Sequence, residues 1–180
     1  QSGAKKITLE DIYKNRRFSS KGVYGIMPMV NGDHYCQLKK DSLNVYEYAT
    51  GKRITTLVQQ QQLIPAGDTS PVDMGSFEFS SDEKRILFAT DEEPIYRRSS
   101  KASYYIYDVA SGKIVPLSKG GKQRLASFSP DGSDVAFVRD NNIFVVDADA
   151  LLGNPANAAE KQLTTDGRMN EVINGATDWV

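Results

Sequence analysis

A strand-and-turn phrase that occurs twice constrains the fold of this chain more than any other feature. Phe79-Ser80-Ser81-Asp82 is followed, 49 positions later, by Phe128-Ser129-Pro130-Asp131. Each copy ends one short apolar run and precedes another, so each predicts two antiparallel strands joined by a tight turn. In the second copy Pro130 fixes φ, and Gly132 supplies the positive φ that such turns need. We therefore expect a fold built from repeated β-hairpins.

The stretch Leu125–Asp149 shows the most regular unit. It predicts three strands, Leu125–Phe128, Asp134–Arg139 and Ile143–Val146, of which the middle one alternates between two faces. The second turn, Asp140-Asn141-Asn142, has the composition of a tight hairpin turn. Three strands of this size bury too little apolar surface to be stable alone, so neighbouring sheets are required.

A second repeated phrase sets the size of the unit. Val45-Tyr46-Glu47-Tyr48-Ala49-Thr50-Gly51-Lys52 matches Ile106-Tyr107-Asp108-Val109-Ala110-Ser111-Gly112-Lys113, and a further short strand follows each copy. Four-stranded units of about 40–60 residues are typical of a β-propeller. The sequence predicts an all-β fold with about three four-stranded antiparallel blades and the start of another. Because a propeller needs about four to eight blades to close, we expect this chain to be part of a longer ring.

The expected division of the chain follows from these units. We expect a lead-in segment at 1–20, blade one at 21–58, a connecting loop at 59–75, blade two at 76–118, blade three at 119–164 and the start of the next blade at 165–180. Thr8 and Asp11 have the spacing of a helix N-cap pair. The apolar residues around them are expected to hold the lead-in against a core: Ile7, Leu9, Ile12 and Tyr13. In blade three the last connection is expected to be a loop, Leu151–Lys161.

Blade two contains an insertion that is a candidate site. Residues 91–102 separate two expected strands, whereas blade three has only Asp140-Asn141-Asn142 at that point, so we expect an extended loop. It carries an acidic triplet, Tyr96, Arg97 and Arg98, and loops on rigid scaffolds often carry sites. Two interpretations are open. The arginines pair weakly with the acids in solvent, or one of them points into a cavity and binds carbonyl or carboxylate oxygens.

Composition excludes several classes of function. The formal net charge of −1 gives no reason to expect nucleic acid or an anionic membrane as a partner. No apolar run approaches the roughly 18 residues of a membrane span. Cys36 is the only cysteine, so no disulfide forms within the chain.

The sequence lacks the common catalytic and metal-binding motifs. His34 and Cys36 could share a strand face, but nothing nearby supplies further metal-ligand spacing, so we expect neither a metal site nor a cofactor. Neither a G-x-S-x-G elbow nor a G-x-x-x-x-G-K phosphate loop occurs. Asp82 and Asp131 occupy repeated turn positions, which favours turn capping over catalysis. No catalytic residue is expected in this chain.

Several phrases in order resemble a known family, the N-terminal region of dipeptidyl peptidase IV, a serine exopeptidase of the prolyl oligopeptidase type. They are Ile7-Thr8-Leu9-Glu10-Asp11-Ile12-Tyr13, Ala102-Ser103-Tyr104-Tyr105-Ile106-Tyr107-Asp108, the block from Phe128 to Val145, and Ile173-Asn174-Gly175-Ala176-Thr177-Asp178-Trp179-Val180. The resemblance covers essentially the whole chain, and its last phrase is the most specific.

The resemblance implies an eight-bladed propeller followed by an α/β-hydrolase domain that carries a Ser–Asp–His triad and releases Xaa-Pro or Xaa-Ala dipeptides. This chain would supply substrate positioning and access control rather than the triad. The family's aspartate-tryptophan-valine phrase is followed by a tyrosine and a glutamate pair that bind the substrate's amino group, and this chain stops at Val180. Aligned on Ala102, the family's substrate-binding arginine corresponds to Arg97, and its aromatic neighbour corresponds, less firmly, to Tyr96.

The implied partners are peptides with proline or alanine in second position, the protein's own C-terminal α/β-hydrolase domain and a second copy in a homodimer. The implied location is periplasmic, cell-surface or secreted. The alternative is a propeller without enzymatic activity that acts as an interaction scaffold. The two differ in the residues beyond Val180, where Tyr-Glu-Glu and a later G-x-S-x-G would support the exopeptidase.

Overall fold

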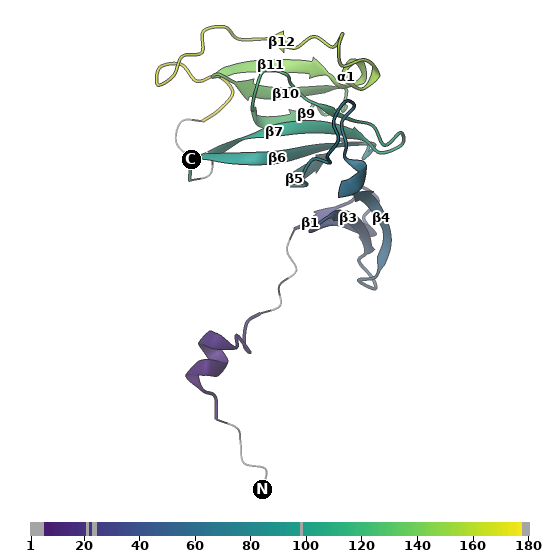
Figure 1. The fold of residues 1–180 in the computed structure, drawn as a ribbon, viewed down its shortest axis with the longest axis vertical. Coiled ribbons are helices and arrows are strands. Elements are labelled where there is room, and N and C mark those ends of the chain that lie inside the picture. Colours follow the sequence, from purple (N-terminus) through teal and green to yellow (C-terminus); the bar gives the residue numbers. More distant parts are fainter. Residues whose placement is uncertain (1–5, 21, 23–24, 98, 178–180) are drawn as a thin grey trace.

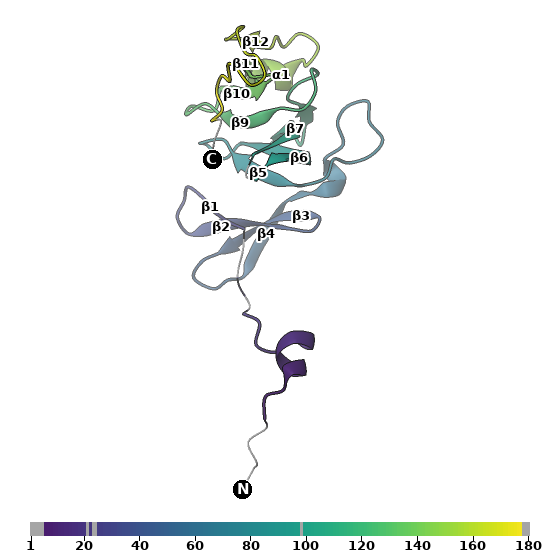
Figure 2. The same ribbon diagram turned by 90° about the vertical axis from the view of Figure 1, so that its left-hand side faces the viewer.

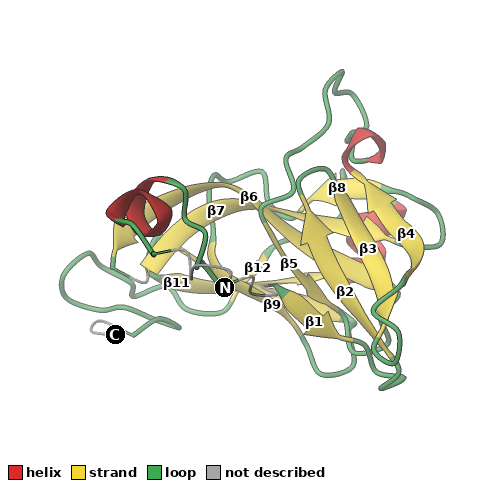
Figure 3. Cartoon of the chain, turned by 90° about the horizontal axis from the view of Figure 1, so that it is seen from below, coloured by secondary structure: helices red, strands yellow, loops and turns green. Residues whose placement is uncertain are grey.

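The computed structural model describes residues 6–20, 22, 25–97 and 99–177, which form three four-stranded antiparallel sheets in chain order (Figure 1). The expected all-β architecture of four-stranded blades is confirmed. Sheet one contains β1 (Ile26–Pro28), β2 (His34–Lys39), β3 (Ser42–Glu47) and β4 (Arg53–Gln59); sheet two contains β5 (Ser76–Phe79), β6 (Arg85–Tyr96), β7 (Ser99–Asp108) and β8 (Ile114–Pro116); sheet three contains β9 (Arg124–Phe128), β10 (Asp134–Arg139), β11 (Asn142–Asp147) and β12 (Lys161–Gln162). The helical pieces are η1 (Glu10–Lys14), η2 (Gln60–Gln62) and α1 (Ala148–Gly153), and Figure 3 shows how little of the chain they occupy.

Sheet two lies between the other two sheets and packs on both (Figures 1 and 2). Side chains alternate along its strands, as the two-residue period of a strand requires. Ile86 and Phe88 pack against sheet one, while Leu87 between them packs against sheet three. All three side chains are buried. The apolar runs that the sequence shows in blade two are therefore explained by burial on both faces.

The repeated turn phrase forms the same hydrogen bonds in both copies. The Asp82 carboxylate accepts a bond from the Ser80 hydroxyl (2.8 Å) and one from the backbone N–H two residues later (3.1 Å). Asp131 accepts the same pair, 2.6 Å from the Ser129 hydroxyl and 3.0 Å from the N–H two residues later. These bonds lower the pKa of each carboxyl to about 2. The interpretation of Asp82 and Asp131 as turn-capping residues is confirmed.

The second repeated phrase also forms equivalent turns. Asp108 accepts bonds from the backbone N–H and hydroxyl of Ser111 (2.7 and 2.6 Å), and Glu47 accepts one from the Thr50 hydroxyl (2.6 Å). A glycine with positive φ, 64° in one copy and 70° in the other, completes each turn. Short polar side chains and one glycine thus position the outer strands β4 and β8 of sheets one and two.

Helix α1 occupies the start of the connection that was expected to be a loop at Leu151–Lys161. Asp147 caps it by accepting a bond from the Ala150 N–H (2.7 Å), and Leu151 is only 5% exposed. That expectation is wrong for its first residues, because an aspartate N-cap and a buried leucine stabilise one and a half turns of helix there.

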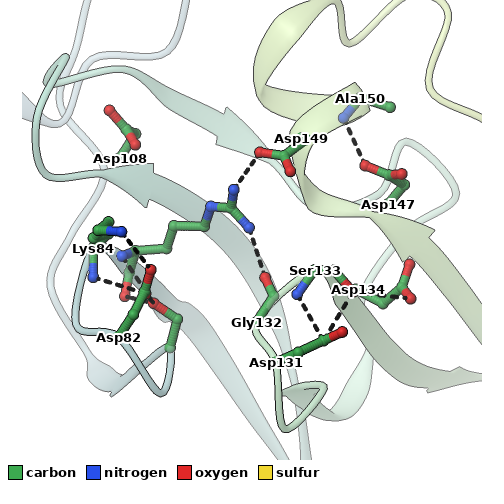
Figure 4. A network of polar contacts seen from close by, with 12 residues as sticks. Asp82, Lys84, Asp108, Asp131, Gly132, Ser133, Asp134, Asp147, Asp149 and Ala150 are labelled. Atoms are coloured by element: carbon green, nitrogen blue, oxygen red, sulfur yellow. Dashed lines mark hydrogen bonds and ion pairs between the residues drawn. The ribbon is translucent and has the colours of Figure 1, made fainter.

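Polar contacts join sheets two and three around this helix. Arg85 of β6 donates to the Gly132 carbonyl (2.6 Å) and forms an ion pair with Asp149; Figure 4 shows both acceptors together with the two turn aspartates. Lys113 donates to the Leu152 carbonyl at the far end of α1. The relative position of the two sheets is therefore set by hydrogen bonds as well as by the apolar core.

The lead-in forms a single π-helical turn whose N-cap position is Leu9, one residue after the expected Thr8, although the expected Thr8–Asp11 pair is bonded. The Thr8 N–H donates to the Asp11 carboxylate (3.2 Å), and the Asp11 N–H donates to the Thr8 hydroxyl (3.1 Å). The expectation that this segment packs on a core is wrong: its apolar residues are between 45% and 77% exposed, namely Ile7, Leu9, Ile12 and Tyr13. The reciprocal pair stabilises the turn locally, and Figure 1 shows the turn apart from the three sheets.

After β12 the described residues contain one isolated bridge, Arg168–Val172. The next blade expected at 165–180 stays a prediction, and its last three residues lie outside the described part. None of the helices in the described ranges has the length and apolar character of a membrane span.

Candidate functional site

The candidate site lies on a β-hairpin formed by the two central strands of sheet two, β6 and β7, which extend beyond the ends of the outer strands. β6 has twelve residues, twice the six of its counterpart β10 in sheet three. It stays paired with β7 as far as the Tyr96–Ser99 pair, with two register shifts on the way (Figure 1). We call residues 91–102 the arginine arm; Arg98 lies outside the described residues.

The arm is a paired hairpin, so the expectation of an irregular loop is wrong. When a chain extends out of a sheet and returns to it, its outgoing and returning segments can pair, which satisfies their backbone polar groups. Asp91, at the first shift, has a φ of 51°, as bulged residues often do. Pro94 lies beside the second shift, where its missing N–H does not interrupt a regular ladder.

The acids of the arm are bonded to residues other than Arg97. Glu93 pairs with Lys101 (3.0 Å) and Lys122 (2.6 Å), and Lys122 also pairs with Asp91 (2.7 Å). Hydrogen bonds from the two lysines, Lys122 first, lower the pKa of Glu93, and the two acids raise the pKa of Lys122. Since Lys122 lies two residues before β9, these pairs attach the arm to the next blade.

Arg97 is exposed at the tip of the arm. Its guanidinium carbon lies 6.0 Å from the centre of the Tyr96 ring, and it forms no hydrogen bond or ion pair with any residue that the structure describes. The interpretation in which it pairs with the acidic triplet is therefore wrong for this residue. The N–H donors of the Arg97 guanidinium are therefore available to a ligand.

A cavity of about 360 Å³ opens beside the guanidinium of Arg97. Its wall comes entirely from the arm: Glu92, Pro94, Tyr96, Arg97, Ser99 and Ser100. The Ser100 hydroxyl donates to Glu92, which orients that carboxylate. The charged and hydroxyl groups of this wall can bind a polar ligand.

A second cavity, of about 430 Å³, shares Tyr96 and Ser99 with the first and is also lined by Arg124 of β9. The sequence did not identify Arg124 as a candidate; this residue immediately precedes the expected strand Leu125–Phe128. In the structure, Arg124 is followed by a β-bulge at Leu125, whose φ is 52°. No pattern in the sequence marks that bulge.

His34 and Cys36 do not form a ligand pair. The Nδ1 of His34 lies 2.8 Å from the Asn31 side-chain nitrogen. Cys36 is fully buried, and burial raises the pKa of its thiol to about 11. Among the residues that the structure describes, no three His, Cys, Asp or Glu side chains are grouped so as to hold a metal ion.

Comparison with known proteins gives the family of the chain. Residues 80–180 match the family described as "Dipeptidyl peptidase IV (DPP IV) N-terminal region". The crystal structure of Porphyromonas gingivalis dipeptidyl peptidase 4 is similar to this chain with a TM-score of 0.77 and 38% identity, over 99% of this chain and 24% of that one. A probable dipeptidyl peptidase 4 from Aspergillus fumigatus is 33% identical over 99% of this chain and 22% of its own length.

A probable dipeptidyl-aminopeptidase B from Grosmannia clavigera is 35% identical over 74% of this chain and 14% of its own length. The chain therefore spans about a quarter or less of the length of these relatives. The repeated blades, the phrases around the arginine arm and these matches together show that the chain belongs to the dipeptidyl peptidase IV N-terminal region family.

Proposed function

We propose that this chain is the first part of the propeller of a longer serine exopeptidase that releases Xaa-Pro and Xaa-Ala dipeptides, and that it positions the substrate. The observation that carries the proposal is Arg97. It lies exposed at the tip of a hairpin that is attached to the next blade, beside Tyr96 and a cavity, without an acidic partner in the described residues. The names of the relatives support the reaction class.

The chemistry of an exopeptidase explains why an arginine is useful there. The enzyme must recognise a free ammonium group at a fixed distance from the bond that it cuts. Carboxylates pair with that charge, and a nearby arginine keeps them ionised and oriented. The same guanidinium donates to the substrate's carbonyl oxygens. Holding the dipeptide at both groups places its carbonyl for attack by a serine from another domain.

The remaining parts of the proposal concern partners. We infer that the substrates are peptides with proline or alanine in second position and that a C-terminal α/β-hydrolase domain of the same protein supplies the triad. We also infer a homodimer, and a periplasmic, cell-surface or secreted location. These inferences rest on the family resemblance; sedimentation of the full-length protein and fractionation of its host cells test the last two.

Replacing Arg97 tests the central claim. In the full-length protein, Arg97→Ala is expected to lower kcat/KM for a glycyl-proline reporter. The decrease should correspond to a loss of about 2–4 kcal/mol of transition-state stabilisation, which fits a charge-assisted contact. Arg97→Lys should recover part of this, since lysine keeps the charge but lacks the planar fork. Arg53→Ala, an exposed arginine on β4 of sheet one, is the matched control. Activity of Arg97→Ala within a few-fold of wild type would show that the site is assigned wrongly.

A further inference from the structure

Arg124 is held at the base of the arginine arm by the residue before it. Gln123 exchanges two backbone hydrogen bonds with Ala102, both 2.9 Å, and its side-chain oxygen accepts a third from the Tyr104 N–H (3.2 Å). Gln123 is 2% exposed. The residue that precedes β9 is therefore bonded to the base of the arm.

A bulge determines where Arg124 leaves the strand. Ser127 pairs with Ala136 and Arg124 pairs with Val138, so two residues of β9 lie opposite one residue of β10. Leu125, inside the bulge, has a φ of 52° and a side chain that is 60% exposed. A bulky residue with positive φ is strained and persists only where its surroundings require it. Bulges of this kind redirect a neighbouring side chain and are frequent next to binding sites.

The guanidinium of Arg124 has no partner in the part of the chain that the structure describes. Its Nε is buried and makes no hydrogen bond, and the side chain forms no ion pair. Two other largely buried arginines are paired: Arg85 with Asp149, and Arg139 with Glu160 at 2.7 Å. Arg124 lines a cavity without an acidic partner among the described residues, so its positive charge favours an anionic ligand there.

The cavity around Arg124 suits a side chain that ends in a carboxylate. It measures about 430 Å³ and combines the amides of Asn141 and Asn170 with the apolar side chains of Ile95 and Ile173. A guanidinium matches the two oxygens of a carboxylate with two parallel hydrogen bonds. Tyr96 and Ser99 also line the cavity beside Arg97, so a ligand bound there can extend into this one.

We propose that Arg124 binds a carboxylate of the peptide ligand, which makes it a charge-specific determinant in addition to Arg97. The identification of the ligand as a peptide rests on the proposed function. The consequence is selectivity: peptides with a glutamate at the position that reaches this cavity bind more tightly than the same peptides with glutamine.

Calorimetric titration of the full-length protein, with its nucleophilic serine replaced by alanine so that peptides stay intact, tests this proposal. The probes are four-residue peptide amides with proline in second position and either glutamate or glutamine at position 1, 3 or 4, and one further pair with a free or amidated C-terminus. We expect at least about a tenfold preference for the carboxylate at one position, the factor that corresponds to one charge-assisted hydrogen bond.

Arg124→Gln is expected to remove this preference while changing the affinity of the neutral peptides by less than about twofold. Arg124→Lys keeps the charge and should retain part of the preference, which also shows that the site still folds. Arg53→Gln is the matched control and should leave the preference unchanged. Three results would overturn the proposal: no preference in the wild type, an equal preference in Arg124→Gln, or an equal loss for all peptides, which would mean that an acidic group of the protein itself bonds Arg124.

The same titrations separate this proposal from the role of Arg97. Arg97→Ala should weaken the glutamate and glutamine peptides by the same factor. If it has no effect while Arg124→Gln still removes the preference, the role of Arg97 is wrong and that of Arg124 stands. The reverse pattern would refute only the role of Arg124.

Discussion

At the scale of single residues, the two turn aspartates make stability depend on pH. The Ser129 hydroxyl, followed by the N–H and hydroxyl of Ser133, lowers the pKa of Asp131 from its ordinary 3.8 to about 2. A carboxyl whose pKa is lowered in the folded state stabilises it above the unfolded pKa, and this contribution disappears as the pH falls through the folded pKa. We expect Asp131→Asn to lower the free energy of unfolding at pH 7 and to flatten its decrease between pH 4 and 2, as measured by urea denaturation.

Asp140→Asn is the control for this substitution. Asp140 is an exposed turn residue with a φ of 50°, which asparagine also adopts, and its carboxylate makes no hydrogen bond in the described part of the chain. The variant should unfold like the wild type at every pH. Equal pH profiles for Asp131→Asn and the wild type would show that the turn bonds do not contribute to stability.

The sequence identified those residues whose role depends on local neighbours. Asp82 and Asp131 could be assigned to turns because their partners lie two residues away. Arg97 could be selected as a candidate because blade three provides a shorter version of the same hairpin. Arg124 could not be found, since its exposure to a cavity depends on a bulge at Leu125 and on segments distant in sequence.

At the scale of elements, Lys122 determines how firmly the arginine arm is held. Its ammonium bonds the carbonyl of Asp91 (2.6 Å) and the carboxylates of Asp91 and Glu93. Lys122→Met is expected to increase amide hydrogen exchange in residues 91–102 by about fivefold or more. Because ion pairs near the surface contribute little to global stability, the midpoint of thermal unfolding should change little. Hydrogen-exchange mass spectrometry and thermal unfolding measure the two effects.

Lys101→Met provides the comparison, because Lys101 contributes a single exposed pair with Glu93 and lies within the arm itself. Its effect on exchange should be clearly smaller. If the two variants exchange alike, attachment to the next blade is not what orders the arm.

Element types were predictable where side chains alternate, and less so where charges or short helices intervene. The strands follow from the alternating Asp134–Arg139 and from short apolar runs such as Ile86–Phe88, which is buried on both faces of sheet two. The arm was expected to be a loop because blade three has only a short turn at that point, yet backbone pairing continues through the inserted residues. Helix α1 was missed because six residues are too few to show a helical period, and its cap residue, Asp147, also ends a strand.

At the scale of the whole molecule, sheets one and three each pack on one neighbour only, within the part that the structure describes. Large apolar side chains are exposed in both, among them Ile54 and Leu125. Surfaces of this kind promote association. We expect the isolated 180-residue chain to form dimers or larger species whose average mass, measured by light scattering, rises across a tenfold range of concentration. Ile54→Lys should reduce this rise.

Thr55→Lys is the matched variant, with the same charge added at the adjacent exposed position of β4. It should reduce association less than Ile54→Lys does. A constant monomer mass across the whole range would contradict the expectation.

The packing of sheet two on both neighbours has a consequence for the order in which the molecule loses structure. Stability in a stack of repeats is close to a sum of units and nearest-neighbour interfaces, so thermal opening begins at the two ends. Sheet two takes part in both apolar clusters, whereas each outer sheet takes part in one. The strands β6 and β7, which flank Arg97, should therefore be the last to open.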